Sequence, residues 1–228
     1  MIANAHVLEL VDLNESVLQV TLKPLQYINY IAGQYLEIIV GTESFAYSIA
    51  NAPCIPEVYI LHIKHRQDNP IAPRLMQALQ GSIIKISAPL GVCHLDMLDP
   101  GLPLICVAGG SGIAPIKAIL DQLVDSCDSR PVHLFWGARA NGDFYLQTSI
   151  SQWQANLSDF SRLLKLSDID QAPLISAVLE QAQDLHRSQI VLSGPFDMVY
   201  HARDVLIAAG VSSTNLFADA FTFENKGE

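Results

Sequence analysis

The order of apolar and polar positions divides this chain into two parts with different periods. Up to about residue 99, short runs alternate apolar with polar residues, as in strands that bury one face. From residue 103 onward, continuous apolar runs alternate with segments whose apolar residues recur every three to four positions. Those two features are typical of buried strands and amphipathic helices. The patterns therefore predict two domains of different class.

The first part is predicted to be a small antiparallel β-barrel over residues 1–99. Gly and Pro residues separate its apolar runs at hairpin-like intervals. The expected strands are 18–23, 34–40, 58–65 and 82–88, with one helix at about 70–79.

The second part, residues 100–228, is predicted to be a doubly wound parallel five-stranded sheet. Strands that alternate with helices form parallel sheets with helices on both faces. The expected strands are 103–108, 131–136, 160–166, 189–193 and 214–218, and the expected helices lie near 113–125, 145–155, 173–184 and 196–209. The Pro- and Gly-containing segment 98–103 is a natural boundary.

Composition and charge exclude several function classes. The formal net charge is −10 and Lys and Arg form no basic stripe, which argues against nucleic-acid binding. The four cysteines (54, 93, 106 and 127) lie far apart without metal or redox spacing, so no metal site is expected. Without a signal-peptide pattern or an apolar run of membrane-spanning length, a cytoplasmic protein is expected.

One turn carries candidate chemistry. The apolar run 103–108 breaks into Gly109, Gly110, Ser111 and Gly112, and a helical pattern follows. Such a turn presents backbone N–H groups, and the helix N-terminus adds a favourable potential for an anion. The pattern indicates a site for the diphosphate of a nucleotide.

Five motifs in this order give the whole chain its resemblance to the ferredoxin–NADP reductase superfamily. They are AGQYL at 32–36, FAYSIAN at 45–51, APLG at 88–91, the glycine turn with Pro115 at 108–115, and LSGPFDM at 192–198. Two further segments, HLFWGAR at 133–139 and NLFADAFTF at 215–223, are similar to bacterial NAD(P)H:flavin oxidoreductases of the luciferase-associated type.

The resemblance implies an enzyme that transfers hydride from C4 of NADH or NADPH to N5 of FMN, FAD or riboflavin and releases reduced flavin. A flavin-dependent monooxygenase or oxygenase would then be the downstream acceptor. Two alternatives stay open. One is a reductase with tightly bound flavin that passes electrons to a protein partner such as an oxygenase. The other is a non-catalytic regulator that binds flavin or nucleotide.

Site residues follow from the resemblance, motif by motif. Ser48 is expected to be catalytic, by donating a hydrogen bond to flavin N5. The expected flavin-binding residues are Phe45, Ala46, Tyr47, Ser48, Ile49, Ala50, Asn51 and Phe221. Backbone groups of residues 49–51 are expected at the flavin's pyrimidine edge. The family usually has Arg where this chain has Phe45, so a phosphorylated flavin is expected to bind less tightly.

The expected coenzyme-binding residues are Gly109, Gly110, Ser111, Gly112, Ile113, Pro115, Arg139, Ser193 and Gly194. Arg139 is placed near an adenine ribose or its 2′-phosphate. Because no second cation lies near it in the sequence, NADH is at least as well supported as NADPH. Asp143 is expected only to cap the next helix.

Overall fold

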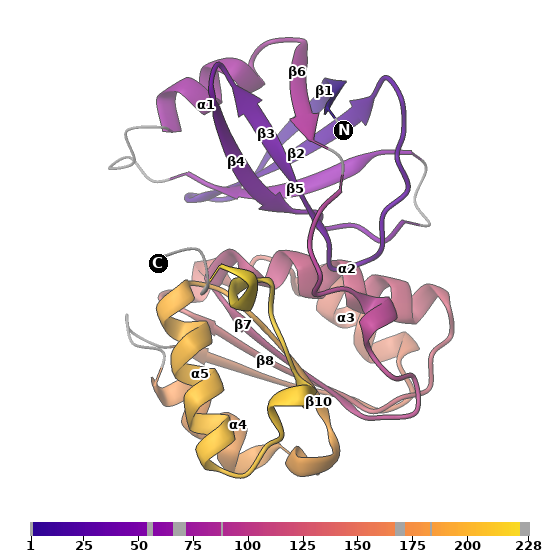
Figure 1. The fold of residues 1–228 in the computed structure, drawn as a ribbon, viewed down its shortest axis with the longest axis vertical. Helices are drawn as coiled ribbons and strands as arrows, with labels where there is room; N and C mark the ends of the chain where they lie inside the picture. Colours follow the sequence, from indigo (N-terminus) through magenta and orange to yellow (C-terminus); the bar gives the residue numbers. More distant parts are fainter. Residues whose placement is uncertain are drawn as a thin grey trace.

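The structure is a computed structural model, and it describes residues 2–53, 57–65, 72–87, 89–166, 172–182 and 184–223. A barrel domain lies above an α/β domain, and the two are in contact (Figure 1). The two-domain fold class predicted from the sequence is confirmed.

The first domain is a six-stranded antiparallel sheet of order β4-β3-β6-β1-β2-β5. Its elements are β1 (Ile2–Asn14), β2 (Val17–Pro24), β3 (Tyr35–Val40), β4 (Glu43–Ser48), β5 (Tyr59–Lys64), α1 (Ala72–Leu79) and β6 (Ile83–Ser87). The edge strands β4 and β5 meet where Ile49 bridges Leu61 and the Ala50 N–H donates to the Ile60 carbonyl at 2.7 Å. These contacts close the sheet into a barrel.

Strand β1 was not among the strands expected individually from the sequence. Its pairing with β2 is irregular between Val7 and Glu9 and again between Asp12 and Asn14. Each irregularity shifts the phase of the inward-facing positions, so no single period of two runs through the strand.

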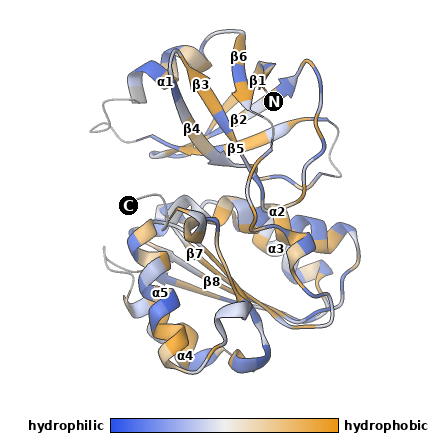
Figure 2. Ribbon diagram, in the orientation of Figure 1, coloured by the Kyte–Doolittle hydropathy of each residue, from blue (hydrophilic) through white to orange (hydrophobic). Residues whose placement is uncertain are grey.

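The second domain is a five-stranded parallel sheet of order β11-β10-β7-β8-β9. Its strands are β7 (Leu104–Gly109), β8 (Val132–Ala138), β9 (Phe160–Leu166), β10 (Gln189–Ser193) and β11 (Leu216–Phe217). Its helices are α2 (Ile113–Asp125), α3 (Gln147–Asn156), α4 (Ala172–Gln181) and α5 (Phe196–Ala208). The strands are hydrophobic along most of their length (Figure 2) because helices cover both faces.

Each face of this sheet has its own core. One contains α2 and α3 packed around Trp136 and Trp153, and the other contains α4 and α5. Cys93 and Leu98, just after the barrel, belong to the first of these cores. The domain boundary near residue 99 stays a prediction.

Two predicted elements are shorter than expected. The strand expected at 214–218 is limited to Leu216–Phe217 because a 3₁₀ turn at Ser213–Asn215, capped by the Ser212 hydroxyl, precedes it. The helix expected to reach residue 184 ends at Gln181, and Asp184 has a left-handed φ of 49° that no α-helix accommodates.

Candidate functional site

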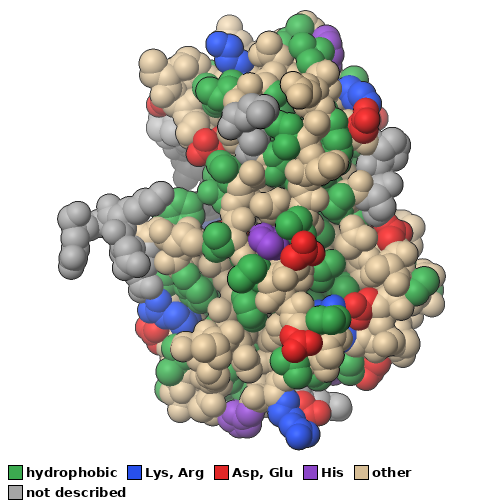
Figure 3. All heavy atoms as spheres, turned by 45° about the vertical axis from the view of Figure 1, so that its right-hand side comes forward, with side chains coloured by type: hydrophobic (Ala, Val, Ile, Leu, Met, Phe, Trp, Pro, Cys, Tyr) green, Lys and Arg blue, Asp and Glu red, His purple; other side chains and the backbone are tan. Residues whose placement is uncertain are grey.

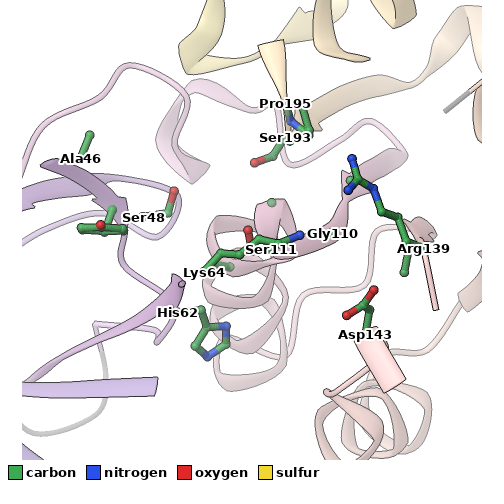
Figure 4. Close-up of a pocket in the computed structure, with 16 residues that line it drawn as sticks. Ala46, Ser48, His62, Lys64, Gly110, Ser111, Arg139, Asp143, Ser193 and Pro195 are labelled. Atoms are coloured by element: carbon green, nitrogen blue, oxygen red, sulfur yellow. The ribbon is translucent and has the colours of Figure 1, made fainter. Parts of the chain in front are cut away.

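A cavity of about 470 Å³ lies between the two domains. The barrel contributes Ala46, Tyr47 and Ser48 at the end of β4, with His62 and Lys64 of β5. The second domain contributes the glycine turn, Arg139, Asp143 and the residues that follow β10 (Figure 4). The carboxyl ends of β7, β8 and β10 therefore face the barrel, where open α/β sheets bind their ligands.

The glycines of the turn have different physical roles. Gly110 has a φ of +55°, which favours glycine, and its carbonyl accepts a hydrogen bond from Trp136 Nε1 at 2.9 Å. A Cβ on Gly109 would lie 2.4 Å from Met198 Sδ, and one on Gly112 would lie 2.4 Å from the Ser193 carbonyl oxygen. The close Ser193 and Gly194 backbone thus leaves no room for a side chain at 112, whereas a Cβ at 109 would meet mainly the Met198 side chain. All three glycines line the cavity.

The predicted coenzyme residues are largely brought together. Residues 109–112, Arg139, Ser193 and Gly194 line this cavity. Pro115 lines a second cavity, whereas Ile113 is fully buried in the core beneath α2. Ile113 supports the turn by packing, and its side chain faces neither cavity.

A second cavity of about 280 Å³ adjoins the first. Both are lined by Ala46, Ser48, Ser193 and Gly194. The rest of its wall is mostly apolar and aromatic and includes Tyr35, Phe196, Phe223, Val199 and Ile119, with Cys93 and Asp219. Two cavities of different character thus meet at the end of β4.

Tyr47 and Ser48 both line the first cavity, although alternation along a strand directs neighbouring side chains to opposite faces. Tyr47 also packs in part against the barrel core. Burial raises the pKa of the Tyr47 phenol to about 12, so the hydroxyl stays protonated at neutral pH.

Of the other members of the predicted flavin motif, Ala46 lines both cavities, whereas Phe45 and residues 49–51 lie outside them. The N–H groups of Ile49 and Ala50 donate to the carbonyls of Gln34 and Ile60 at 3.0 and 2.7 Å. The Asn51 side chain is fully buried; it accepts from the Ile60 N–H and donates to the Val58 carbonyl. Because these groups close the barrel, the expectation that they bind the flavin edge is not supported. Phe45, paired with Ile38 in β3, also lines neither cavity.

Phe221 is not at the cavity where the sequence resemblance placed it. The 3₁₀ turn Asp219–Thr222 directs Phe221 against the core under α5, with the Arg203 guanidinium 5.7 Å from its ring centre. Phe223 lines the second cavity instead, with its ring centre 5.8 Å from that of Phe196. The turn, which the sequence pattern did not indicate, exchanges the two aromatic positions.

The sequence of residues 106–204 matches the family described as the oxidoreductase NAD-binding domain. The cytochrome P450 reductase GcoB from Amycolatopsis has the same fold, with a TM-score of 0.84 at 24% identity over 96% of this chain and 69% of that one. A ferredoxin reductase of carbazole 1,9a-dioxygenase gives a TM-score of 0.81 at 24% identity, over 97% of this chain and 69% of that one. These matches support the resemblance of the chain to the ferredoxin–NADP reductase superfamily.

Curated relatives of this chain include two kinds of reductase. An NAD(P)H-flavin reductase from Vibrio harveyi is 29% identical over 223 residues, which cover 90% of this chain and 92% of the relative. Reductase component 1 of terephthalate 1,2-dioxygenase from Comamonas sp. is 31% identical over 204 residues, which cover 86% of this chain. The chain spans 60% of that component's length, and 66% of a CDP-6-deoxy-L-threo-D-glycero-4-hexulose-3-dehydrase reductase from Yersinia pseudotuberculosis.

Two residues of β5 that were not predicted as site residues also line the first cavity. His62 is 5% exposed, and its Nδ1 lies 3.4 Å from the Tyr145 hydroxyl of the second domain. Burial, together with the positive charge of Lys117, lowers the pKa of His62 to about 3. Lys64, two residues further along the same strand, lines the same cavity as Arg139. A second cation is thus present that linear spacing from Arg139 did not indicate.

Asp219, which lines the second cavity, was also not predicted as a site residue. Its Oδ1 accepts hydrogen bonds from the Val92 and Cys93 N–H groups at 2.8 and 3.0 Å. Gly91 leaves room for the carboxylate, since a Cβ there would lie 2.9 Å from Oδ2. Burial raises the pKa of Asp219, and it outweighs the two amides and His94, which lower it. The tail is thereby tied to the segment that follows the barrel.

Asp143 does not cap helix α3, whose N-cap residue is Leu146. Its carboxylate instead accepts from the Ala140 N–H at 3.2 Å and from Asn14 Nδ2 of the barrel at 3.4 Å. The preference for helix caps was wrong here because the carboxylate stabilises the short turn Asn141–Asp143 beside the cavity.

Within the described ranges, no group of three His, Cys, Asp or Glu side chains could hold a metal ion. Cys54 lies outside the described residues, as do residues 70 and 71 of the expected helix and Ala88 of the expected strand 82–88. No helix in the described part of the chain is long and apolar enough to cross a membrane. On the face seen in Figure 3, acidic and basic side chains are scattered, without a continuous basic surface.

Proposed function

We propose that this protein catalyses NAD(P)H-dependent reduction of a free flavin, either FMN, FAD or riboflavin, and releases the reduced flavin. The observation that carries the proposal is the meeting of two cavities at Ser48, Ser193 and Gly194. One has a glycine turn and cations suited to a dinucleotide, and the other has flat aromatic walls suited to a tricyclic ring. Hydride transfer needs its two heterocycles about 3–3.5 Å apart, which a shared wall permits.

The residues present fit these two ligands. The glycine turn leads directly into α2, whose N-cap residue Gly112 makes no side-chain cap, and the Ile113 N–H donates to the Gly110 and Ser111 carbonyls. The backbone of the turn and the positive end of the helix would hold a diphosphate. The nicotinamide coenzyme supplies the hydride and the flavin accepts it. The chain's own contribution is to bind and orient both and to exclude water.

Ser48 is the proposed catalytic residue. It lines both cavities, next to the proposed site of each ligand. A hydroxyl can donate a hydrogen bond to the flavin atom that gains electron density, and such donors act most strongly where charge develops.

The composition of the second cavity favours a flavin that is recognised by its ring. Among the described residues that line it, the only charged side chain is Asp219, and no Lys or Arg is present. The described part of this wall therefore offers no cation to a flavin phosphate. Transient binding of a substrate flavin is consistent with such a site.

A reductase with tightly bound flavin that serves a protein acceptor is the second candidate. The match to the reductase component of terephthalate dioxygenase favours it, because that protein is named as part of an oxygenase system. Flavin-dependent monooxygenases or oxygenases are the acceptors proposed for either candidate.

The deciding experiment follows the absorbance of NADH with purified protein, with and without added FMN, FAD or riboflavin. A flavin reductase is expected to be nearly colourless and to oxidise NADH only when free flavin is present. A yellow protein that reduces an artificial acceptor without added flavin would contradict this and support the second candidate. Binding of flavin without turnover would instead indicate a regulator.

A further inference from the structure

A buried indole holds the peptide between Gly110 and Ser111 in the glycine turn. Trp136 Nε1 donates a hydrogen bond to the Gly110 carbonyl at 2.9 Å, and the Ile113 N–H donates to the same oxygen. Trp136 is fully buried and lines neither cavity, whereas Gly110 and Ser111 line the first cavity (Figure 4). The Gly110 carbonyl therefore points into the protein and away from the cavity.

The orientation of this peptide decides which group the turn presents to an anion. No cis peptide bond occurs in the described part of the chain, and in a trans peptide the C=O and the next N–H point in opposite directions. With the Gly110 carbonyl directed at the indole, the Ser111 N–H is directed to the cavity side. The reversed peptide plane would present a carbonyl oxygen there, whose partial negative charge repels a phosphate.

Glycine leaves the backbone of this turn open to such a reversal. Gly110 has a φ of +55°, and a residue without a Cβ adopts positive and negative φ about equally readily. The backbone at residue 110 therefore constrains the orientation of the next peptide only weakly. A hydrogen bond from a donor that is itself fixed in place supplies the missing constraint.

Aromatic neighbours fix the indole that makes this hydrogen bond. The Trp136 ring packs edge-on against Phe144 and Tyr145, with ring centres 5.2 and 5.5 Å apart. Tyr145 packs edge-on in turn against His62 of the barrel, with ring centres 5.4 Å apart. The indole thus cannot move away from Gly110 without displacing two rings, one of which contacts strand β5 of the other domain.

We infer that Trp136 is a positioning residue for the nicotinamide dinucleotide: its indole N–H keeps the Gly110–Ser111 peptide oriented with N–H, and not C=O, toward the diphosphate. The inference rests on the proposed function and deepens it, because binding of the coenzyme then depends on a buried residue of β8 that contacts no ligand. Since Trp136 acts only through the turn, its effect is confined to ligands that carry a diphosphate.

The first test measures binding without turnover. Isothermal titration calorimetry with ADP-ribose, which has the diphosphate but no nicotinamide, compares the wild type with Trp136→Phe. The phenyl ring keeps an aromatic group in the core and removes the N–H donor. The dissociation constant of Trp136→Phe is expected to be about tenfold higher, which is the order of one lost hydrogen bond.

Trp153→Phe is the matched control. Trp153 is fully buried in the same core as Trp136, and its Nε1 likewise donates a hydrogen bond, to Asp121 Oδ1 at 2.8 Å. It lines neither cavity, so Trp153→Phe should bind ADP-ribose within about twofold of the wild type. Equal weakening in the two variants would show a general effect of core packing and would overturn the assignment.

The second test measures flavin reduction with two hydride donors. For Trp136→Phe, KM for NADH is expected to rise about tenfold while kcat stays at the wild-type value, because the lost binding is equal in the ground and transition states. With the phosphate-free donor 1-benzyl-1,4-dihydronicotinamide, kcat/KM should not change. A similar loss with both donors would contradict the assignment, since positioning at the diphosphate affects NADH alone.

A variant that keeps the shape of the indole covers the case in which Trp136→Phe does not fold. Replacing the Trp136 indole by benzothiophene puts a sulfur atom in the place of the N–H, and the same weakening of about tenfold is expected. If a folded variant without the N–H binds ADP-ribose as tightly as the wild type, the role of Trp136 is refuted and the proposed reductase activity stands. If the wild type itself does not bind ADP-ribose, the coenzyme site at the glycine turn is refuted, and the Trp136 assignment with it.

Discussion

At the scale of single residues, the candidate site is a set of polar groups placed on an apolar junction. Of the predicted flavin residues, Ala46 and Ser48 line both cavities, and Ser48 is the one of the two with a hydroxyl. Ser193, the last residue of β10, also lines both cavities. A change at Ser48 should therefore act on the chemical step more than on the binding of either ligand.

Ser48→Ala is expected to lower kcat for flavin reduction by about tenfold or more, with a smaller change in KM. The reason is that the lost hydrogen bond is strongest where charge develops during hydride transfer. Stopped-flow single-turnover measurements isolate that step. Ser44→Ala, on the same strand but outside both cavities, is the control, and an unchanged transfer rate in Ser48→Ala would rule out the role.

At the scale of secondary-structure elements, turns and their close approaches define the site. The β7–α2 turn can lie against the end of β10 only because residue 112 lacks a side chain. At the tail, the Asp219 carboxylate holds the 3₁₀ turn Asp219–Thr222 against the segment at Val92 and Cys93. The close approach at the turn and the hydrogen bonds of Asp219 both depend on how separate elements pack together.

Gly112→Ala is expected to lower the free energy of unfolding by about 2 kcal/mol, because the added Cβ would meet backbone and overpacking has a cost of this order. Urea denaturation measures the change. Gly142→Ala is the matched control, since a Cβ at that position has no heavy atom within 4 Å. Identical unfolding midpoints for the two variants would contradict the close approach at Gly112.

Asp219→Ala is expected to destabilise the protein by about 1–3 kcal/mol, because it leaves the Val92 and Cys93 N–H groups without their acceptor. Asp219→Asn keeps an acceptor oxygen and should retain most of the stability. Thermal or chemical denaturation of both variants at one pH measures this difference. Equal destabilisation by Ala and Asn would show that the two N–H contacts are not the source.

The pH dependence of the same pair follows from the raised pKa of Asp219. A carboxyl whose pKa is higher in the folded than in the unfolded state favours folding at low pH, and this contribution is lost as the pH rises through the folded pKa. The stability of the wild type relative to Asp219→Asn should therefore decline as the pH is raised from about 4 toward neutrality. A constant difference across that range would refute the shift.

At the scale of the whole molecule, the two domains form one site because they contact each other at several points. Asn14 of the barrel donates to the Gly142 carbonyl at 3.1 Å, and His62 contacts Tyr145. The tail contact through Asp219 adds a third connection. These contacts place the end of β4 opposite the carboxyl ends of the parallel strands (Figure 1).

The His62 contact makes the assembled molecule sensitive to acid. Burial lowers the pKa of His62 from 6.5 to about 3, so between these values the unfolded chain binds a proton that the folded protein does not. The contribution of His62 to stability is present above about pH 6.5 and is lost as the pH falls toward 3. Wild type should lose stability more steeply over this range than His62→Gln.

Urea denaturation at a series of pH values measures that slope. His6→Gln is a suitable control because it removes a histidine of β1 that lines neither cavity. Parallel pH profiles for the wild type and His62→Gln would show that His62 is not the group that titrates on unfolding.

The amino-acid sequence alone determined the fold class, most of the elements and the glycine turn. These depend on local periods and on backbone conformations that particular residues require, such as the positive φ of Gly110. It also indicated Ser48 and Arg139, because each belongs to a short motif next to a predicted strand.

The tertiary structure alone decided that Lys64, His62 and Asp219 border the cavities, that Phe223 replaces Phe221 there, and that residues 49–51 close the barrel. Those outcomes depend on contacts between residues far apart in the chain, as between Asp219 and Val92, and no local pattern carries that information.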